Sequence, residues 1–594
     1  MQKKLLVFVL LIIFSVLTIG SMLHNSATSD EVTHITSGYS YWKYFDYTFN
    51  PEHPPLVKLW ATIPLIIIDP VLPDKPSSWE GDQWDYAKTF LYKSGNNADQ
   101  IYFWSRIMIV LIGILLGYYV YRWASELFGW KAGLLALVFY VFDPNILAHS
   151  TIVHTDIPIS AAIFITLYYF WKYTQKSEAT WKQWSLLGIL VGLCLATKFT
   201  GIYVIPFLVI LYFVHLFFDK YDGQGDVYTR IEGFYKHFIE GEGKKEFKNG
   251  ITAFCIIIAV GIIILILSYG IVNVKSFFTG LSMVFSQSLG DRAGYLLGMN
   301  SVQGWWYYFI VAFFVKTPAS TLIVLFAALF LFFKTKHDNK KIRNALFLLI
   351  PAVLYFIAFI PSKYNIGHRH ILPIYPFLFV FMSSIISVDL ESLGDKFARY
   401  KKYAKIVLLF LIALLIMGTV FAYPYFIPYF NELIGGSENG HKYLLDSNLD
   451  WGQGLKETAQ WIDENGYDDT VIRMSYFGNE EPEYRGIKYQ KIMCGPTPGI
   501  HVISANKLYD FMGNQYGCVD WLFDYDPVTV IGHSIYIYNI NDPYIIEKDD
   551  LCKQNCKEGC NSRGEQYGDS MYKSAEDSCL CLCAEASNED LGIL

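Results

Sequence analysis

The sequence predicts a polytopic α-helical membrane protein that ends in an extracytoplasmic α/β domain and a Cys-rich tail. Three observations lead to this fold class: an apolar composition, eleven stretches long enough to cross a bilayer, and a basic bias of alternate loops. Of the 594 residues, 53% are hydrophobic and only 17% are charged, which is too apolar for an ordinary soluble protein. The net charge of −7 mixes both signs, so no nucleic-acid partner is expected.

Stretches that can cross roughly 30 Å of hydrocarbon are expected near 4–22, 101–123, 132–149, 156–173, 185–199, 201–218, 251–272, 304–334, 343–361, 370–388 and 403–423. The outer part of 304–334 is interrupted by Lys316 and Pro318. The first follows Lys3 and Lys4 as in a secretory signal, but no small-residue cleavage site clearly follows, so we expect a retained span. The stretch 185–218 is too long for one helix and barely long enough for two, with Lys198 near its middle.

Loop charge favours two helices in 185–218. The segments on the side of Lys3 then carry about 23 Lys and Arg residues, whereas the short segments on the other side carry about six. The positive-inside rule therefore predicts a cytoplasmic N-terminus and an outer C-terminus. Three regions are expected on the outer face: a first outer loop over 23–100, the segment 273–304, and everything after Phe421.

The chain is predicted to divide into a transmembrane domain over 1–423, an α/β domain over 424–545 and a tail over 546–594. In the α/β domain, Leu455–Glu464 has helical spacing closed by Gly466. Strands are expected at Val471–Tyr476, Ile500–Ser504 and Val528–Ile540.

Cysteine usage supports an oxidising compartment for the C-terminal part. An even number of cysteines lies there, so disulfides are the expected state. Zinc is the alternative, although C-x-C and C-x3-C are not the usual zinc spacings. Cys194 and Cys255 lie in predicted spans and are expected to be buried. The disulfide candidates are Cys494, Cys518, Cys552, Cys556, Cys560, Cys579, Cys581 and Cys583.

Ionisable residues at the outer ends of spans differ in kind from the Lys and Arg of the inner face. Acids, bases and fixed cations converge there, and such residues tend to line a pathway or a site. They are Asp30, Glu31, His34, His53, Asp143, His149, His154, Asp156, Lys198, Arg292, Lys316, His368, Arg369 and His370.

The acidic pair Asp30 and Glu31 follows Ser29, which can cap a helix that runs towards Phe45. On that helix Asp30 and His34 share a face, whereas Glu31 points roughly 100° away. One carboxylate of the pair is therefore expected to meet a reacting group. The alternative is that both carboxylates only favour a helix N-terminus.

Two further segments concentrate polar side chains. The segment 143–158 contains two histidines and two aspartates, and its alternative interpretation is a solvated, Pro-broken loop. Arg369 lies between two histidines; interfacial anchoring is the alternative for all three, and for Lys198 and Lys316. Fixed cations beside carboxylates suit an anionic lipid head group with a reaction next to it.

At these residues the sequence resembles the membrane glycosyltransferases that use polyprenyl- or dolichyl-phosphate sugars, the GT-C class that includes protein O-mannosyltransferases and aminoarabinose transferases. The likeness spans roughly residues 1–480. It is carried by Asp30-Glu31, the block Asn50-Pro51-Glu52-His53-Pro54-Pro55-Leu56, Pro144-Asn145 with His149 and Asp156, Ala196-Thr197-Lys198-Phe199-Thr200, Lys316-Thr317-Pro318, Gly367-His368-Arg369-His370-Ile371-Leu372-Pro373 and Asp446-Ser447-Asn448-Leu449-Asp450-Trp451-Gly452-Gln453.

The resemblance implies an inverting transfer of a sugar from a polyprenyl- or dolichyl-phosphate donor to an acceptor hydroxyl of a protein, lipid or glycan. Asp30 or Glu31 would act as base and Asp156 would orient the acceptor or the sugar. The donor phosphate would be held by Lys198, Lys316, His368, Arg369 and His370. Substrate contacts are expected from His34, His53, His149 and His154. The resemblance requires no cofactor, and the histidines make a divalent metal possible.

Other functions fit the sequence less well than a glycosyltransferase. A transporter or flippase of a lipid-linked or anionic substrate should show inverted repeats and broken helices, and the sequence shows neither. A receptor or scaffold would leave the acidic pair and the His-Arg-His cluster without a role. No outer loop has room for the β-trefoil domain of eukaryotic O-mannosyltransferases, and Asp450-Trp451-Gly452 does not match the acceptor motif of oligosaccharyltransferases.

Overall fold

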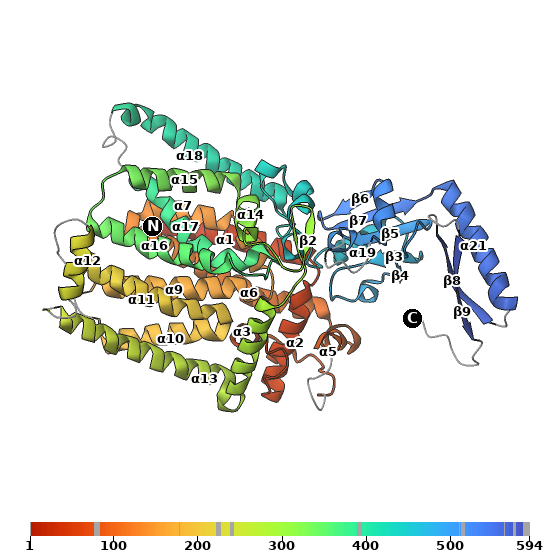
Figure 1. Cartoon of the computed structure of the whole chain (residues 1–594), viewed down its shortest axis with the longest axis horizontal. Coiled ribbons are helices and arrows are strands. Elements are labelled where there is room, and N and C mark those ends of the chain that lie inside the picture. Colours follow the sequence, from red (N-terminus) through yellow and green to blue (C-terminus); the bar gives the residue numbers. More distant parts are fainter. Residues whose placement is uncertain are drawn as a thin grey trace.

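The computed structural model describes residues 2–75, 83–176, 179–220, 227–237, 241, 243–388, 395–509, 511, 517–562, 565–573 and 578–585. A long bundle of helices occupies one end of the molecule, a mixed sheet follows it, and a helix with a two-stranded sheet lies at the far end (Figure 1). The predicted fold class is confirmed: a polytopic helical membrane protein with a C-terminal α/β part and a disulfide-bonded tail.

The bundle and the segments at its end contain the helices α1 (Gln2–His24), α2 (Ser29–Tyr44), α3 (Leu56–Ala61), α4 (Leu65–Ile68), α5 (Gln83–Lys88), α6 (Ala98–Phe128), α7 (Trp130–Val141), α8 (Pro144–Ser150), α9 (Asp156–Thr174), α10 (Trp181–Thr197), α11 (Val204–His215), α12 (Val227–Tyr235), α13 (Lys244–Leu289), α14 (Tyr308–Lys316), α15 (Ala319–Lys334), α16 (Asn339–Phe359), α17 (Tyr375–Ser383) and α18 (Asp395–Ala422). The C-terminal part contains α19 (Leu455–Glu464), α20 (Ala505–Leu508) and α21 (Pro543–Ser562). The strands are β1 (Gly294–Leu296), β2 (Met299–Ser301), β3 (Ile472–Ser475), β4 (Tyr489–Lys491), β5 (Gly499–Ser504), β6 (Thr529–Ile531), β7 (Ile535–Ile540), β8 (Glu565–Lys573) and β9 (Ser578–Glu585).

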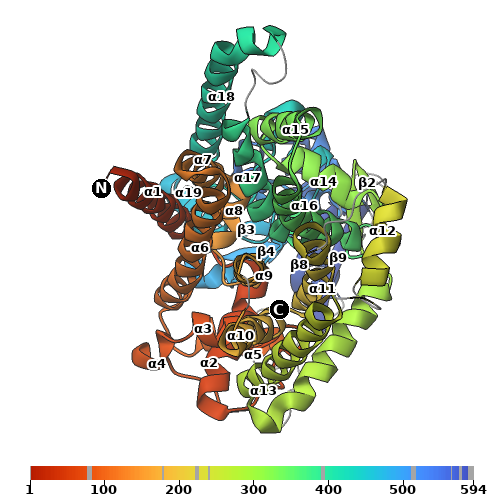
Figure 2. The same cartoon turned by 90° about the vertical axis from the view of Figure 1, so that its left-hand side faces the viewer.

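Within the described ranges, seven helices are long and apolar enough to cross a membrane, or up to nine if each of two bent pairs is one span. The predicted number of eleven is therefore not confirmed. The two expected spans outside this set are α9 and α10. The α10 helix has only 17 residues, and α9 is buried along most of its length inside the bundle (Figure 2).

The stretch 185–218 is divided as predicted. The α10 helix ends at Thr197, Lys198 adopts an extended conformation with φ −156° and ψ 146°, and a 3-10 turn over Phe199–Tyr203 leads into α11. The prediction that Lys198 lies at the break between two helices is thus confirmed.

Two pairs of helices are bent, and one of the bends lies at the predicted interruption of 304–334 by Lys316 and Pro318. The α7–α8 pair turns by 65° and the α14–α15 pair by 108°. The second bend falls at Pro318, which lacks a backbone N–H and disfavours a helical conformation at Thr317, where ψ is 130°. The Asn145 amide donates to the Lys316 carbonyl at 2.8 Å, so the two bends are joined.

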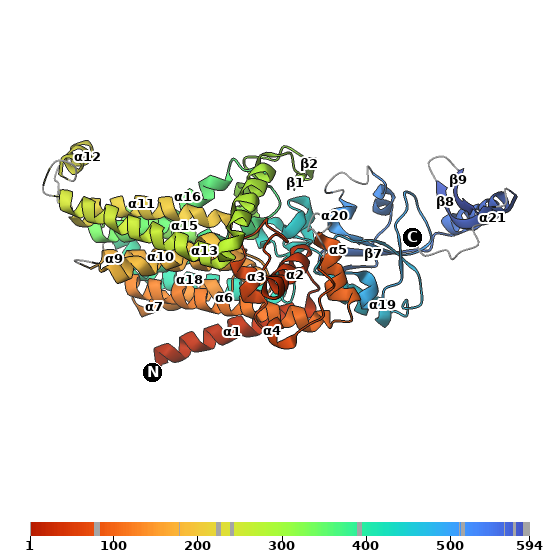
Figure 3. The same ribbon diagram turned by 90° about the horizontal axis from the view of Figure 1, so that it is seen from below.

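The first outer loop forms α2 to α5 at the end of the bundle nearest the sheet (Figures 1 and 3). Its apolar side chains form a core of their own that includes Val32, Ile35, Tyr39 and Phe90 and packs on Ile109 of α6. This core holds α2 against the bundle.

The C-terminal sheet has the order β4-β3-β5-β7-β6. The β3 strand is parallel to both β4 and β5, whereas β7 is antiparallel to β5 and β6. The predicted helix Leu455–Glu464 and the strands near Val471 and Ile500 are confirmed. The single strand Val528–Ile540 is wrong, because a turn at Gly532, with φ 51°, divides it into β6 and β7.

Disulfides join the cysteines of the C-terminal part, as predicted. The pairs are Cys494–Cys518, Cys552–Cys579 and Cys556–Cys581, and Cys560 is also disulfide-bonded. The side chain of Cys583 lies outside the described residues. Cys194 is buried as expected, but Cys255 is exposed, because it lies on the outer surface of α13.

Candidate functional site

The helix that carries the acidic pair begins one residue earlier than predicted. Thr28, with φ −78° and ψ 156°, is the N-cap instead of Ser29. The reason is a capping box: Glu31 lies three residues after Thr28, and its Oε2 accepts the Thr28 backbone N–H at 2.9 Å. One carboxylate of the pair is thus used to start α2.

Glu31 is fully buried, and both of its carboxylate oxygens accept hydrogen bonds. Arg106 of α6 donates to it through Nε at 2.9 Å and through Nη2 at 2.7 Å. The Val153 backbone N–H donates to Glu31 Oε1 at 2.9 Å. Arg106 also donates to the carbonyl oxygens of Met22, Asn25 and Ser26. This ion pair fixes α1, α2, α6 and the segment before α9 to one another.

Asp30 points into a different environment, as expected from its helical position. Its side chain is 28% exposed, and its Oδ2 lies 3.3 Å from His154 Nε2 and 3.5 Å from Arg369 Nη2. Burial alone would raise the pKa of Asp30, but the neighbouring His154 ring and the Arg369 charge hold this pKa well below its usual range. Asp30 is therefore an ionised, reachable carboxylate.

Asp156 binds the cations around Asp30 into one cluster. Its Oδ1 accepts from Lys198 Nζ at 2.6 Å, and its Oδ2 lies 2.7 Å from His154 Nδ1 and 3.8 Å from Arg369 Nη1. The break between α10 and α11 brings Lys198 here, and the 3-10 turn His368–Ile374 brings Arg369. We call Asp30, His154, Asp156, Lys198 and Arg369 the acid–cation cluster.

The segment Asp446–Gln453 reaches this cluster from the C-terminal part. The Arg369 guanidinium lies 4.2 Å from the ring centre of Trp451, and Arg369 Nε donates to Ser447 Oγ at 3.1 Å. The His154 ring is 5.3 Å from the Trp451 ring. Trp451 and Ser447 belong to the segment that carries the family resemblance, but they are not among the predicted site residues.

His34 and His53 lie beside the cluster. Their ring centres are 4.8 Å apart, and His34 is 5.0 Å from His154. Burial and the neighbouring charges of His154 and Lys58 lower the pKa of His34 to about 3, so its imidazole is neutral at physiological pH.

Four other predicted residues have different surroundings. Lys316 Nζ donates to the carbonyls of Ile427 and Asn448, at 2.8 Å each, and His368 Nε2 lies 2.6 Å from the Tyr375 hydroxyl. His370 packs against aromatic rings, and His149 lies 6.1 Å from the Trp451 ring. Only part of the predicted phosphate-binding set therefore joins Asp30 in the acid–cation cluster: Arg369 directly, and Lys198 through Asp156.

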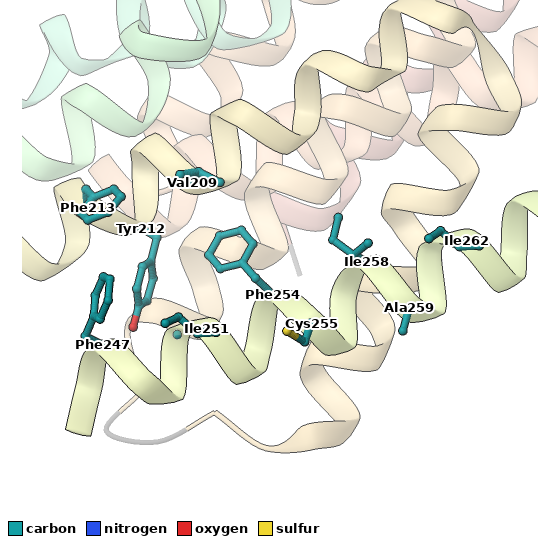
Figure 4. Close-up of a pocket in the computed structure, with 11 residues that line it drawn as sticks. Val209, Tyr212, Phe213, Phe247, Ile251, Phe254, Cys255, Ile258, Ala259 and Ile262 are labelled. Atoms are coloured by element: carbon teal, nitrogen blue, oxygen red, sulfur yellow. The ribbon is translucent and has the colours of Figure 1, made fainter. Parts of the chain in front are cut away.

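A cavity of about 620 Å³ lies elsewhere, on the face of α11 and α13 (Figure 4). Its walls are apolar side chains such as Phe213, Phe254 and Ile258, and no member of the acid–cation cluster lines it. The residues that line it include Tyr212 and Cys255 but no carboxylate, histidine or cation.

Asp446 and Asp450 are two buried carboxyls in the same segment as Trp451, and they predict that the stability of the protein depends on pH. Burial raises the pKa of Asp450 to about 7 and that of Asp446 to about 6. A carboxyl whose pKa is raised by folding contributes its full stabilisation below its unfolded pKa near 4. As the pH rises from there through the folded pKa, the free energy of unfolding falls by about 1.4 kcal/mol per pH unit for one carboxyl. We expect the wild type to be less stable at pH 8 than at pH 5, and Asp450→Asn to reduce this difference. Thermal unfolding of both proteins at the two pH values measures it, and equal differences would contradict the assignment.

The fold and the cluster define a polytopic membrane protein with a charged, partly accessible site where its helices meet the C-terminal part. The model of the dolichyl-phosphate-mannose-protein mannosyltransferase family matches residues 87–220, which include Arg106, His154, Asp156 and Lys198. The predicted resemblance to glycosyltransferases with lipid-phosphate sugar donors is confirmed over this segment. No curated protein matches the chain.

Several solved structures are similar to the chain at low identity. ArnT from Cupriavidus metallidurans bound to undecaprenyl phosphate is 12% identical, with 91% of this chain and 98% of that chain covered and a TM-score of 0.46. The Pmt1–Pmt2 protein O-mannosyltransferase of S. cerevisiae bound to its sugar donor is 16% identical, with 51% and 41% covered and a TM-score of 0.33. The oligosaccharyltransferase AglB from Archaeoglobus fulgidus, in complex with an inhibitory peptide and a dolichol-phosphate, is 13% identical, with 92% and 75% covered and a TM-score of 0.41.

Proposed function

We propose that the protein is a membrane glycosyltransferase that moves a sugar from a polyprenyl- or dolichyl-phosphate donor to an acceptor hydroxyl on a protein, lipid or glycan. The observation that carries the proposal is the position of Asp30. It is ionised and reachable beside two fixed cations, Lys198 and Arg369, whereas its neighbour Glu31 is fully used by Arg106. The family match over 87–220 supports the same reaction class.

In this reaction Asp30 accepts the proton of the acceptor hydroxyl as the acceptor oxygen attacks the anomeric carbon of the sugar. The bond from that carbon to the phosphate oxygen breaks, and the bonding pair leaves with the lipid phosphate, which inverts the anomeric centre. Lys198 and Arg369 offset the charge that collects on the departing phosphate. Asp156 positions Lys198 and His154 and acts through these two side chains, without touching the reacting atoms itself.

The remaining predicted roles follow from the same proposal. Lys316, His368 and His370 would act on the donor side, and His149 on the substrate side, through the segments they stabilise. The proposed domain division is 1–423, 424–545 and 546–594. The match to a transferase family gives no support to a transporter or flippase, although two helix pairs are bent.

We further propose that the site lies on the non-cytoplasmic face, with a cytoplasmic N-terminus. Lys340 in the first turn of α16 and Glu438 after α18 are both exposed and should lie on opposite sides of the membrane. In intact cells, a membrane-impermeant maleimide should label Glu438→Cys, and it should label Lys340→Cys only after permeabilisation. The reverse pattern would contradict the orientation.

The reaction is tested by incubating the purified chain with radiolabelled dolichyl-phosphate and undecaprenyl-phosphate sugars and a membrane extract as acceptor source. We expect label to leave the lipid fraction with at least one donor. If no donor loses label to any acceptor or to water, the proposed function is wrong. The sugar, the acceptor class and the lipid chain are determined by the donor that reacts and the fraction that gains label.

A further inference from the structure

Three histidines from three separate segments meet beside Asp30. His34 lies on α2, His53 precedes α3, and His154 precedes α9. One ring nitrogen from each lies within 4.8 Å of those of the other two. Long-range folding has therefore brought together three imidazoles that are far apart in the sequence.

The second nitrogens of two of these rings each face an oxygen atom. His34 Nδ1 lies 3.0 Å from the Val153 carbonyl oxygen, which accepts only from a protonated nitrogen. His154 Nδ1 lies 2.7 Å from Asp156 Oδ2. A proton on Nδ1 of each ring leaves a lone pair on Nε2. That of His34 is free, whereas that of His154 faces Arg369 Nη1 at 2.8 Å. A carbonyl or a carboxylate behind the second nitrogen is the arrangement typical of metal-binding histidines.

The third histidine is held through its backbone. The Lys58 ammonium is buried and donates to the carbonyl of Asn50 and, at 2.8 Å, to that of His53. This fixes the loop on which His53 lies and limits the loss of entropy when its ring binds a ligand. The cluster is thus held in place before any ion arrives.

We propose that His34, His53 and His154 bind one Zn²⁺ ion, with the fourth position open. Three imidazole nitrogens and an open position suit zinc, whose bonds to histidine measure roughly 2.0–2.1 Å. Asp30 Oδ2, 3.3 Å from His154 Nε2, supplies negative charge beside the ion. The site adds to the proposed transferase function but does not depend on it, because the binding of the metal can be measured without any substrate.

Arg369 competes with the ion for one ligand. Its Nη1 lies 2.8 Å from His154 Nε2, so a metal at this nitrogen has to displace the guanidinium. The proposal therefore makes two opposite predictions. Removal of a histidine weakens binding, and removal of the Arg369 charge strengthens it.

The experiment uses the full-length protein, purified without reducing agent so that the disulfides of the tail stay closed. After removal of metal with a chelator, Zn²⁺ alone is added, and bound metal is measured by mass spectrometry and by calorimetric titration. We expect one equivalent in the wild type. We expect at least tenfold weaker binding in His34→Gln and His53→Gln, and tighter binding in Arg369→Gln.

The matched control is His441→Gln, which changes a histidine that is stacked on Tyr509, outside the cluster. It should bind zinc as the wild type does. Co²⁺ in place of Zn²⁺ should give the visible absorption of a tetrahedral nitrogen site in the wild type and not in His53→Gln. Failure of the wild type to bind, or unchanged binding in both cluster variants, would overturn the proposal. Arg369→Gln keeps it testable if a histidine variant does not fold.

Discussion

Asp30→Asn is expected to lower kcat for sugar transfer by about 10²–10⁴-fold, because asparagine cannot accept the proton of the acceptor hydroxyl. KM for the lipid-phosphate donor should change little, since Lys198 and Arg369 keep their other partners. Steady-state rates with the reacting donor measure both quantities. The chain should stay folded, because Asp30 is partly exposed and only its contacts to His154 and Arg369 are altered.

Asp463→Asn is the matched control for this change. Asp463 lies near the end of α19 and is exposed, so the same change of charge there should leave transfer at the wild-type rate.

The rate of transfer should also show a particular dependence on pH. Because the pKa of Asp30 is held well below its usual range, its loss of charge should not reduce the rate between pH 5 and pH 8. Asp30→Asn with wild-type activity would remove Asp30 from the mechanism.

Glu31→Gln is expected to destabilise the protein by about 3–5 kcal/mol, because it leaves the buried Arg106 guanidinium without a countercharge. Arg106→Met should have a similar effect, since it leaves the buried Glu31 carboxylate unpaired. Thermal unfolding in detergent, or the yield of monodisperse protein, measures the loss. The expected effect of Glu31→Gln on activity per folded molecule is small.

The double variant Glu31→Leu with Arg106→Met is the informative control. It removes both charges, so it should be more stable than Arg106→Met alone. If Glu31→Gln were as stable as the wild type and inactive, then the roles assigned to the two acidic residues would have to be exchanged.

The sequence predicted those parts of the site that depend on local geometry. Helical spacing put Asp30 and His34 on one face and Glu31 on another, and the charge of the loops located a break at Lys198. Local geometry alone did not predict which of Asp30 and Glu31 is the carboxylate that faces the site. It depends on Arg106, 75 residues further along the chain.

Arg106 itself gave a signal that was overlooked. It lies inside the apolar stretch 101–123, and an arginine in such a position calls for a buried partner. The contacts of Lys316 depend on folding beyond its own helix. A cation at the end of a span suggested a phosphate ligand, but the bend at Pro318 places its ammonium against the backbone carbonyls of Ile427 and Asn448.

Long-range contacts explain the other omissions. Trp451 is more than 80 residues from Arg369, and only the folded chain shows that its ring faces the guanidinium. The turn at Gly532 was missed because Val528–Ile540 alternates on both sides of it, so one strand and a hairpin give almost the same pattern. The eleven spans are not confirmed in the described part of the chain, because α10 has only 17 residues and α9 is not among the helices apolar enough to cross a membrane.

The most direct test of the central claim is the identity of the lipid product. The purified wild type is incubated with the reacting lipid-phosphate sugar and its acceptor, and the lipids and acceptor are analysed by mass spectrometry. We expect free polyprenyl or dolichyl monophosphate and glycosylated acceptor in equal amounts, with neither product above background in Asp30→Asn. Intact donor in the wild-type reaction, or equal turnover in the two proteins, would contradict it.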